Sequence, residues 1–257
     1  CDVAHLVCRC GLHVWDFDHL VTSQQPLQPF HMACEPAPFI DLSDGFEAYR
    51  EQRRATGSDR IPKVLSRARK LERECGPLQF EFQTDRRESL QRMMAWKSAQ
   101  FRQTGFADIF QHEWTLRLLE HLLDNPTEGL SAILSVLSVD GTPVAISYAL
   151  RSASVVHRSA MPFDRAYGKY SPGSIMLLRL AEAAAQAGIR RFELGKGEQQ
   201  YKRSLMTGSR LLAEGAVTCR PLIRALRKGW FATRDLVRTS PLRKPAESAA
   251  NISRIVS

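Results

Sequence analysis

The stretch Tyr170-Ser171-Pro172-Gly173-Ser174, followed by an apolar run, has the residue types of an anion-binding loop that leads into a helix. Pro172 suits a first helical turn, because its ring fixes φ and it has no N–H to leave without a partner. Ser171 is placed to act as the N-cap, and Gly173 and Ser174 leave room for a ligand near the backbone. The first amides of a helix carry partial positive charge, so a pyrophosphate would bind here. An ordinary capped helix start explains the same residues.

Hydrophobic periodicity and turn residues predict the elements around this loop. Three β-branched and apolar segments within residues 131–161, the first two joined by Asp140-Gly141, form an antiparallel meander. The apolar helix ends at Gly188, and residues 189–194 then form a strand parallel to the last strand of the meander. Further helices are expected at 58–75, 85–104, 111–123 and 198–206, and further strands at 78–82 and 211–219. These elements indicate an α+β fold with a mixed, mostly antiparallel sheet flanked by helices.

Composition and charge narrow the class of partner. The chain has 257 residues, of which 44% are apolar, and no apolar run approaches the roughly 18 residues that cross a membrane. Its formal net charge of +9 is concentrated within residues 50–73 and 220–244. These clusters predict an anionic partner, and nucleic acid, anionic lipid and a phosphorylated cofactor all fit. Residues 220–238 have the pattern of a basic amphipathic helix, which packs on a core or lies on an anionic membrane surface.

The cysteines and prolines give three further expectations. The six cysteines form no Cys-x-x-Cys pair and the histidines lack zinc spacing, so no metal site is predicted. Scattered cysteines of this kind are expected to be reduced thiols of a cytoplasmic protein. Thr22–Pro38 contains four prolines and is interpreted as a linker. The chain begins at Cys1 rather than Met, so an upstream segment is expected to be missing.

Several motifs together resemble the acyl-CoA-binding core of the GNAT acetyltransferases. In chain order they are Arg67-Ala68-Arg69-Lys70-Leu71-Glu72, Met161-Pro162-Phe163-Asp164, Tyr170-Ser171-Pro172-Gly173, Phe192-Glu193-Leu194-Gly195-Lys196-Gly197, Tyr201-Lys202 and Leu212-Ala213-Glu214-Gly215. The branch that they resemble is the CelD/BcsL type, which is associated with cellulose biosynthesis and is similar to the FemAB peptidoglycan aminoacyltransferases. The resemblance covers about residues 43–219.

This resemblance implies a GNAT fold over residues 43–219. Members of the branch often carry a first, degenerate copy of the fold, so residues 1–42 are expected to be the remnant of a truncated first domain with its Pro-rich linker. Residues 220–257 would then be a basic C-terminal helix and tail. One departure concerns the Gln/Arg-x-x-Gly-x-Gly/Ala phosphate loop of many GNAT members, because residues 170–174 have fewer glycines in its place. The identity of the acyl donor therefore stays open.

The resemblance also implies a donor site and no metal. The donor would be acetyl-CoA or another acyl-CoA. Its pyrophosphate would bind at Tyr170, Ser171, Gly173 and Ser174, chiefly through the backbone amides. Lys202 would form a salt bridge with a donor phosphate. Lys202 is equally explained as an exposed surface lysine.

Acyl transfer to an amine requires a base, a polarised carbonyl and an acid. The resemblance assigns the acid to Tyr201, which would protonate the departing thiolate, and a strand amide within residues 155–160 would polarise the carbonyl. Either Glu193 or His157 would take the proton of the amine. Each has a structural explanation as well: Tyr201 could bridge helix and sheet, Glu193 could form a surface ion pair, and His157 could be an ordinary strand residue.

Three functions follow from these expectations. The first is an acyltransferase that moves an acyl group from acyl-CoA to an amine or hydroxyl of a small molecule or cell-envelope precursor, linked to polysaccharide biosynthesis. The second is a FemAB-like transferase that takes an aminoacyl group from charged tRNA. The third is a non-catalytic GNAT-like binding module at a membrane. The expected location is cytoplasmic, with peripheral binding to the inner face of the membrane through residues 220–238.

Overall fold

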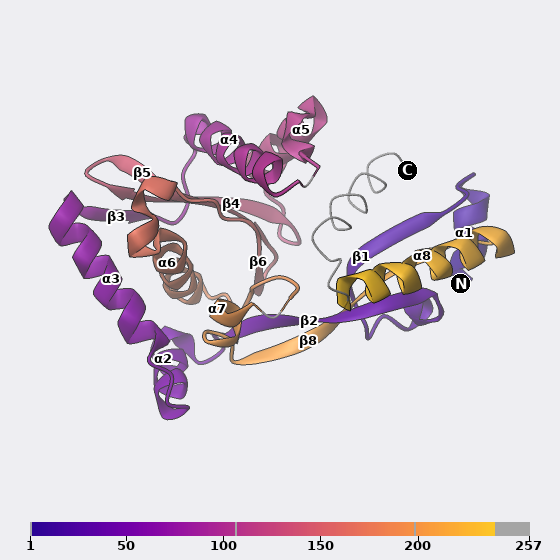
Figure 1. Ribbon diagram of the computed structural model, residues 1–257, viewed down its shortest axis with the longest axis horizontal. Helices are drawn as coiled ribbons and strands as arrows, with labels where there is room; N and C mark the ends of the chain where they lie inside the picture. Colours follow the sequence, from indigo (N-terminus) through magenta and orange to yellow (C-terminus); the bar gives the residue numbers. More distant parts are fainter. Residues whose placement is uncertain (1, 106, 198, 240–257) are drawn as a thin grey trace. The chain divides into compact units, whose positions relative to one another are not determined.

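The computed structural model describes residues 2–105, 107–197 and 199–239 (Figure 1). The chain divides into two compact units. One, here called the central unit, comprises Pro38–Thr104 and Asp108–Gly208. The other, the terminal unit, comprises Cys1–Ala37, Gly105–Ala107 and Ser209–Ser257. Residues from both ends of the chain therefore belong to one unit.

A mixed sheet lies at the centre of the central unit, in the hydrogen-bonded order β2-β7-β6-β5-β4-β3. Strands β6 and β7 are parallel, and their neighbours pair antiparallel. Asp140 and Gly141 both have positive φ between β4 and β5, as a two-residue hairpin turn requires. The predicted meander and the parallel strand that follows it are confirmed. The strands are β2 (His31–Asp41), β3 (Leu78–Glu81), β4 (Ser131–Val139), β5 (Thr142–Arg151), β6 (Val155–Ala160) and β7 (Arg191–Glu193).

Helices cover both faces of this sheet. Figure 1 shows α3 and α6 on one side of β4 and β5, and α4 and α5 on the other. Helix α6 is apolar on nearly every side because the sheet, α2 and α3 all pack against it, and most of its apolar residues are buried. The helices are α2 (Gly45–Ala55), α3 (Arg60–Cys75), α4 (Arg87–Thr104), α5 (Glu113–Asp124), α6 (Pro172–Gln186) and α7 (Gln200–Arg203), with 3₁₀ turns η2 (Ile109–Gln111) and η3 (Arg165–Tyr170).

The interpretation of Thr22–Pro38 as a linker is wrong. Residues 25–30 form a 3₁₀ turn, η1 (Gln25–Phe30), and β2 follows at once. The carbonyl of Pro38 accepts a hydrogen bond from Leu194 N, one residue beyond the end of β7. The β2–β7 ladder itself pairs only residues 39–41 of β2, so the prolines of this strand remove no donor from it. The proline content alone therefore led to the wrong interpretation of β2 as part of a linker.

The terminal unit contains α1 (Val3–Arg9), β1 (Trp15–Val21), η1, most of β2 and β8 (Gly208–Val217), and α8 (Pro221–Thr239). Strand β1 pairs antiparallel with β8. A Cβ on Gly215 would lie 2.0 Å from the carbonyl oxygen of Phe30, so only glycine fits at this point of β8. None of the helices in the described part of the chain has the length and hydropathy of a membrane span.

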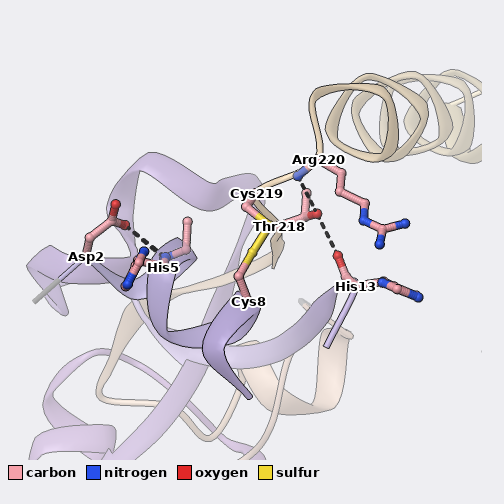
Figure 2. The surroundings of a disulfide bond; sticks show 8 residues. Asp2, His5, Cys8, His13, Thr218, Cys219 and Arg220 are labelled. Carbon is pink, nitrogen blue, oxygen red and sulfur yellow. Dashed lines mark hydrogen bonds between the residues drawn. A yellow bond between two sulfur atoms is a disulfide. The ribbon is translucent and has the colours of Figure 1, made fainter. Parts of the chain in front are cut away.

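A disulfide joins Cys8 of α1 to Cys219, which precedes α8 (Figure 2). The expectation of reduced thiols is therefore wrong for these two residues, while Cys10, Cys34 and Cys75 are free. The two half-cystines are separated by 211 residues in sequence. Spacing rules for short Cys-x-x-Cys motifs give no signal for such a pair, because only the fold brings its members together.

Candidate active site

Two arginines of α3 reach the start of α6. Arg67 Nη1 donates a hydrogen bond to Ser171 Oγ at 2.6 Å, and Arg60 Nη2 donates to Ser174 Oγ at 2.9 Å. The Nε atom of Arg60 is buried and has no hydrogen-bond partner. Within the described chain, neither guanidinium has a carboxylate partner. The loop predicted as an anion site is therefore lined by two cationic side chains that sequence reasoning did not assign to it.

The sequence predicted that the Ser171 side chain would cap α6, but the structure shows no such hydrogen bond. The Ser171 backbone is left-handed, with φ 57° and ψ 55°, and its hydroxyl accepts from Arg67 instead. The amides of Ser174 and Ile175 donate to the Ser171 carbonyl oxygen, whereas no described residue accepts from the amide of Gly173. A single amide at the helix start is thus left for a ligand. The two guanidiniums place charged donors beside a loop that has fewer glycines than the phosphate loop of many GNAT members.

The fit of this site to a pyrophosphate follows from its donors. Two guanidiniums, one open amide and the positive end of the α6 dipole all face the same helix start. A buried Nε without a partner is costly, and a phosphate oxygen would satisfy it. Arg60 and Arg67 are seven residues apart, so they lie on one face of α3. The seven-residue spacing of Arg60 and Arg67, next to the apolar face of α3, was the sequence signal that could have assigned both residues to this loop.

Tyr170 is attached to α3 rather than open to a ligand. Its side chain is buried, and its hydroxyl donates to Glu74 Oε2 at 2.7 Å. Cys75 Sγ donates to the same hydroxyl at 3.4 Å. The hydrogen bond from Tyr170 is the main reason that the pKa of Glu74 lies below its usual value. The Tyr170 side chain thus fixes the loop against the end of α3.

A second cluster surrounds the hydroxyl of Tyr201 in α7. Arg158 of β6 donates through Nη2 to Tyr201 Oη at 3.1 Å and to the Leu194 carbonyl oxygen at 2.8 Å. The Nε atom of Arg158 is buried without a hydrogen-bond partner. Lys97 of α4 belongs to the same electrostatic environment, because burial and, second, the charge of Arg158 lower its pKa. The cluster therefore has cationic groups and no carboxylate paired with Arg158 among the residues described.

Lys202 is almost fully buried, with 3% of its surface exposed. Its Nζ donates to the carbonyl oxygen of Gly195 at 3.0 Å and to that of Lys196. Burial and, to a lesser extent, the charge of Arg158 lower the pKa of Lys202 to about 8. The Lys202 ammonium therefore lies at the turn that follows β7, and two carbonyl oxygens of that turn accept its hydrogen bonds.

Glu193 and His157 are neighbours across the parallel pair β6–β7. They are register partners, so their side chains project to the same face of the sheet. Glu193 is buried, His157 is half-buried, and both make further contacts. The two candidate bases therefore lie together. Glu198, where the short helix was expected to begin, lies outside the described residues, and α7 covers residues 200–203.

Comparison with known proteins decides the family. The model of the acetyltransferase (GNAT) domain family matches residues 58–203, more than half of the chain. The chain belongs to the GNAT acetyltransferase family. A search of curated proteins gives no significant match. Both clusters lie within the matched range.

Solved structures support the same fold. The C-terminal domain of a putative lysylphosphatidylglycerol synthetase from Agrobacterium fabrum aligns with a TM-score of 0.58 and 13% identity, covering 87% of this chain and 75% of that one. The crystal structure of FemX aligns with a TM-score of 0.59 and 9% identity, covering 88% of this chain and 77% of FemX. At these identities the likeness shows the fold alone. The expected α+β GNAT fold, with helices on a mixed sheet, is confirmed.

In this GNAT protein, both clusters lie beside the β6–α6–β7 segment, and α3, α4 and α7 supply further side chains to them. The arginine-lined loop precedes α6, and the Tyr201 cluster follows β7. Within the described residues, no group of three or more His, Cys, Asp and Glu side chains gathers as metal ligands would. The chemistry that the described groups offer is anion binding at the start of α6 and proton transfer near Tyr201.

Proposed function

We propose that this protein transfers an acyl group, such as acetyl, from an acyl-CoA to an amine or hydroxyl acceptor. The observation that carries the proposal is the convergence of Arg60 and Arg67 on the hydroxyls of Ser174 and Ser171 at the start of α6. Two guanidiniums without carboxylate partners in the described chain suit an anionic ligand with more than one charge. The pyrophosphate of coenzyme A has that charge, and the family match gives the reaction class.

The proposed chemistry has three proton and charge movements. Glu193 or His157 removes a proton from the acceptor amine, directly or through water, so that the nitrogen lone pair can attack the thioester carbonyl. The carbon–sulfur bond then breaks, and the sulfur receives the proton of the Tyr201 hydroxyl. Arg158, which contacts that oxygen, stabilises the phenolate left behind. Proton return from the solvent or from the base restores Tyr201.

Lys202 has a supporting role in this proposal. Its hydrogen bonds to the carbonyl oxygens of Gly195 and Lys196 hold the turn between β7 and α7. That turn follows Glu193 and leads to Tyr201, so it determines the separation of the base and the acid. An ammonium engaged by two carbonyls is not positioned for a donor phosphate, and we assign the phosphates to Arg60 and Arg67 instead.

The acceptor is proposed from the motif resemblance alone. The CelD/BcsL branch suggests a polysaccharide or cell-envelope precursor rather than a protein side chain. A glycan amine or hydroxyl would serve as the nucleophile in the scheme above. Assays with amino sugars and with simple primary amines, followed by detection of the free thiol of coenzyme A, would compare acceptor classes.

Binding of acetyl-CoA by titration calorimetry tests the proposal directly. Arg60→Ala with Arg67→Ala should weaken binding at least tenfold, because two charge-assisted contacts to phosphate are lost. Arg69→Ala with Lys70→Ala is the matched control, since both are exposed on the same helix and should change the affinity less than threefold. Undiminished binding by the first variant would remove the donor site from the start of α6.

A second candidate is an aminoacyl transferase that uses charged tRNA. It is favoured by the exposed cations Lys63, Arg69, Lys70 and Arg73, which extend the basic surface of α3 beyond the two arginines of the donor site. Phosphates of a tRNA donor would pair with several of these cations, so the affinity for tRNA should fall steeply as the salt concentration rises. For a duplex region, a plot of log affinity against log salt concentration should have a slope of about −0.9 for each phosphate contacted. Binding of acetyl-CoA without any turnover on any acceptor would instead favour a non-catalytic module.

A further inference from the structure

Two side chains of α2 hold the turn that follows α7. Tyr49 Oη donates a hydrogen bond to the carbonyl oxygen of Leu205 at 2.9 Å. Arg53 donates through Nη1 to the carbonyl oxygen of Met206 at 2.7 Å and through Nη2 to that of Ser204 at 3.1 Å. Three consecutive carbonyl oxygens after α7 are therefore bonded to one helix from another part of the chain.

Both anchoring side chains are shielded from water. Tyr49 is 2% exposed, and burial raises the pKa of its hydroxyl, which therefore stays protonated and able to donate. Arg53 is half-buried, and its Nε atom is buried without a hydrogen-bond partner among the described residues. A planar guanidinium that donates to two fixed carbonyls can rotate little, so it holds the turn in one place.

Helix α7 depends on that turn for its position. The helix has four residues, and a single helical turn is not stable by itself in water. The turn completes it: Leu205 N donates to the carbonyl oxygen of Lys202 at 3.0 Å, and Ser204 Oγ donates to that of Tyr201 at 2.8 Å. The contacts of α2 with the turn therefore determine where the Tyr201 side chain begins.

The loop between α2 and α3 connects the same turn to the proposed donor site. Ser58 Oγ donates to the carbonyl oxygen of Ser204 at 3.3 Å and accepts from Arg60 N at 3.4 Å. Arg60 in turn contacts Ser174 at the start of α6. The pyrophosphate and the thiol of coenzyme A lie at opposite ends of the molecule, so the acid that protonates the thiolate must keep a fixed distance from the phosphate site.

We propose that Arg53 is a positioning residue for the acyl transfer. By fixing the turn after α7, it keeps the Tyr201 hydroxyl against Arg158 and at the place where the thiolate leaves. This inference rests on the proposed function, in which Tyr201 is the acid. Arg53 contacts no reacting atom and acts through Tyr201. Its loss leaves α7 free to fray, which slows proton transfer and leaves the donor contacts of α3 intact.

A purely structural role for Arg53 predicts different kinetics. General destabilisation would lower the amount of folded enzyme, so kcat and the number of donor sites found by calorimetry would fall by the same factor. Its effect would also multiply with that of Tyr201→Phe, because the two changes would act independently. A positioning role changes kcat without changing the number of donor sites, and it needs the Tyr201 hydroxyl to have any effect.

Arg53→Met, compared with Arg54→Met, tests the proposal first. Arg53→Met should lower kcat about tenfold to 100-fold, because displacement of a reacting group by about 1 Å has costs of that size. The number of donor sites and Kd for acetyl-CoA should stay unchanged. Arg54→Met removes the same charge from the next, exposed position of α2 and should keep the kcat of the unchanged protein. A kcat of Arg53→Met equal to that of the control would overturn the proposal.

A double variant and hydrogen exchange supply the readouts that a structural role would not give. Arg53→Met with Tyr201→Phe should be less than about twofold slower than Tyr201→Phe alone. In Arg53→Met, the amides of Lys202 and Leu205 should exchange at least about tenfold faster, and those of α6 should not change. Multiplicative losses of kcat would overturn the positioning role while leaving Tyr201 as the acid. A Tyr201→Phe variant with full activity would instead refute the acid itself, and the inference with it.

Discussion

The hydroxyl of Tyr201 accepts a hydrogen bond of 3.1 Å from the guanidinium of Arg158. The two residues are 43 positions apart and come from α7 and β6. The same guanidinium donates to the Leu194 carbonyl oxygen at the end of β7, so it fixes where the Tyr201 oxygen lies relative to the sheet. In the proposed reaction this guanidinium would lie beside the developing negative charge on the Tyr201 oxygen.

Tyr201→Phe tests whether that proton matters. The variant should lower kcat at least 100-fold, within the range of about 10²–10⁴ for loss of a general acid, while Kd for acetyl-CoA changes less than threefold. Tyr167→Phe is the control, because Tyr167 is a half-buried tyrosine of η3 in the same unit and should keep full activity. Steady-state kinetics with thiol detection gives kcat, and calorimetry gives Kd. A kcat equal to that of the unchanged enzyme would exclude Tyr201 as the acid.

Arg158→Gln separates the positioning of Tyr201 from its chemistry. Removal of the guanidinium takes away the donor to Tyr201 and leaves the hydroxyl in place, so kcat should fall about tenfold to 100-fold. The double variant Arg158→Gln with Tyr201→Phe should then be little slower than Tyr201→Phe alone, because the two residues act as one unit. Independent, multiplicative losses in this double-mutant cycle would contradict the coupling that the hydrogen bond implies.

Lys202 gives a prediction about pH and stability. Its pKa is lowered to about 8 in the folded protein, whereas an unfolded lysine titrates near 10.4. Between these values the unfolded chain binds the proton and the folded one does not, so this group makes stability rise with pH from about 8 to about 10.4. At 1.36 kcal/mol per pKa unit, the gain is roughly 3 kcal/mol at most.

Urea unfolding at about pH 7.5 and at about pH 10 compares the unchanged protein with Lys202→Met. The difference in unfolding free energy between the two proteins should shift in favour of the unchanged protein at the higher pH. Other titrating groups are common to both and cancel. A difference that stays constant with pH would show that Lys202 keeps an ordinary pKa in the folded state.

The sequence predicted those helices and strands of the central unit whose apolar pattern or turn residues determine the structure locally. The β-branched and apolar residues 131–139 and the Asp140-Gly141 turn specify the hairpin locally, and the apolar run after Pro172 indicates a buried helix. The contacts of Arg60, Arg67 and Arg158 could not be predicted in the same way. Each joins residues from distant elements, and a basic residue on an exposed helix face has the same local pattern whether it meets a ligand or water.

The terminal unit shows the other limit of sequence reasoning. Pro36 and Pro38 suggested a linker, but they lie in β2, outside the β2–β7 ladder of residues 39–41. The disulfide between Cys8 and Cys219 depends on the folding of both chain ends into one unit. Neither feature has a local signal, because both are set by which strands become neighbours.

Ser171 provides a prediction about the donor loop. Its φ of 57° is a conformation that costs a non-glycine residue roughly 1 kcal/mol. Ser171→Gly should therefore raise the unfolding free energy by about 0.5–1 kcal/mol, since the exposed bond to Arg67 contributes little to stability. Ser171→Ala keeps the strain and removes the same hydroxyl, so it should not stabilise. Thermal unfolding followed by circular dichroism compares the two, and a Gly variant no more stable than the Ala variant would contradict the strain.

The disulfide should stabilise the terminal unit without affecting donor binding. Cys8→Ser with Cys219→Ser should lower the unfolding free energy of that unit by about 2–4 kcal/mol, because the bond closes a long loop in the unfolded chain. Hydrogen exchange resolves the effect by region: amides of α1 and β8 should exchange faster, and those of α6 should not. Cys34→Ser, which removes an exposed free thiol of the same unit, is the control and should change neither. Faster exchange throughout the central unit would show instead that the two units unfold together.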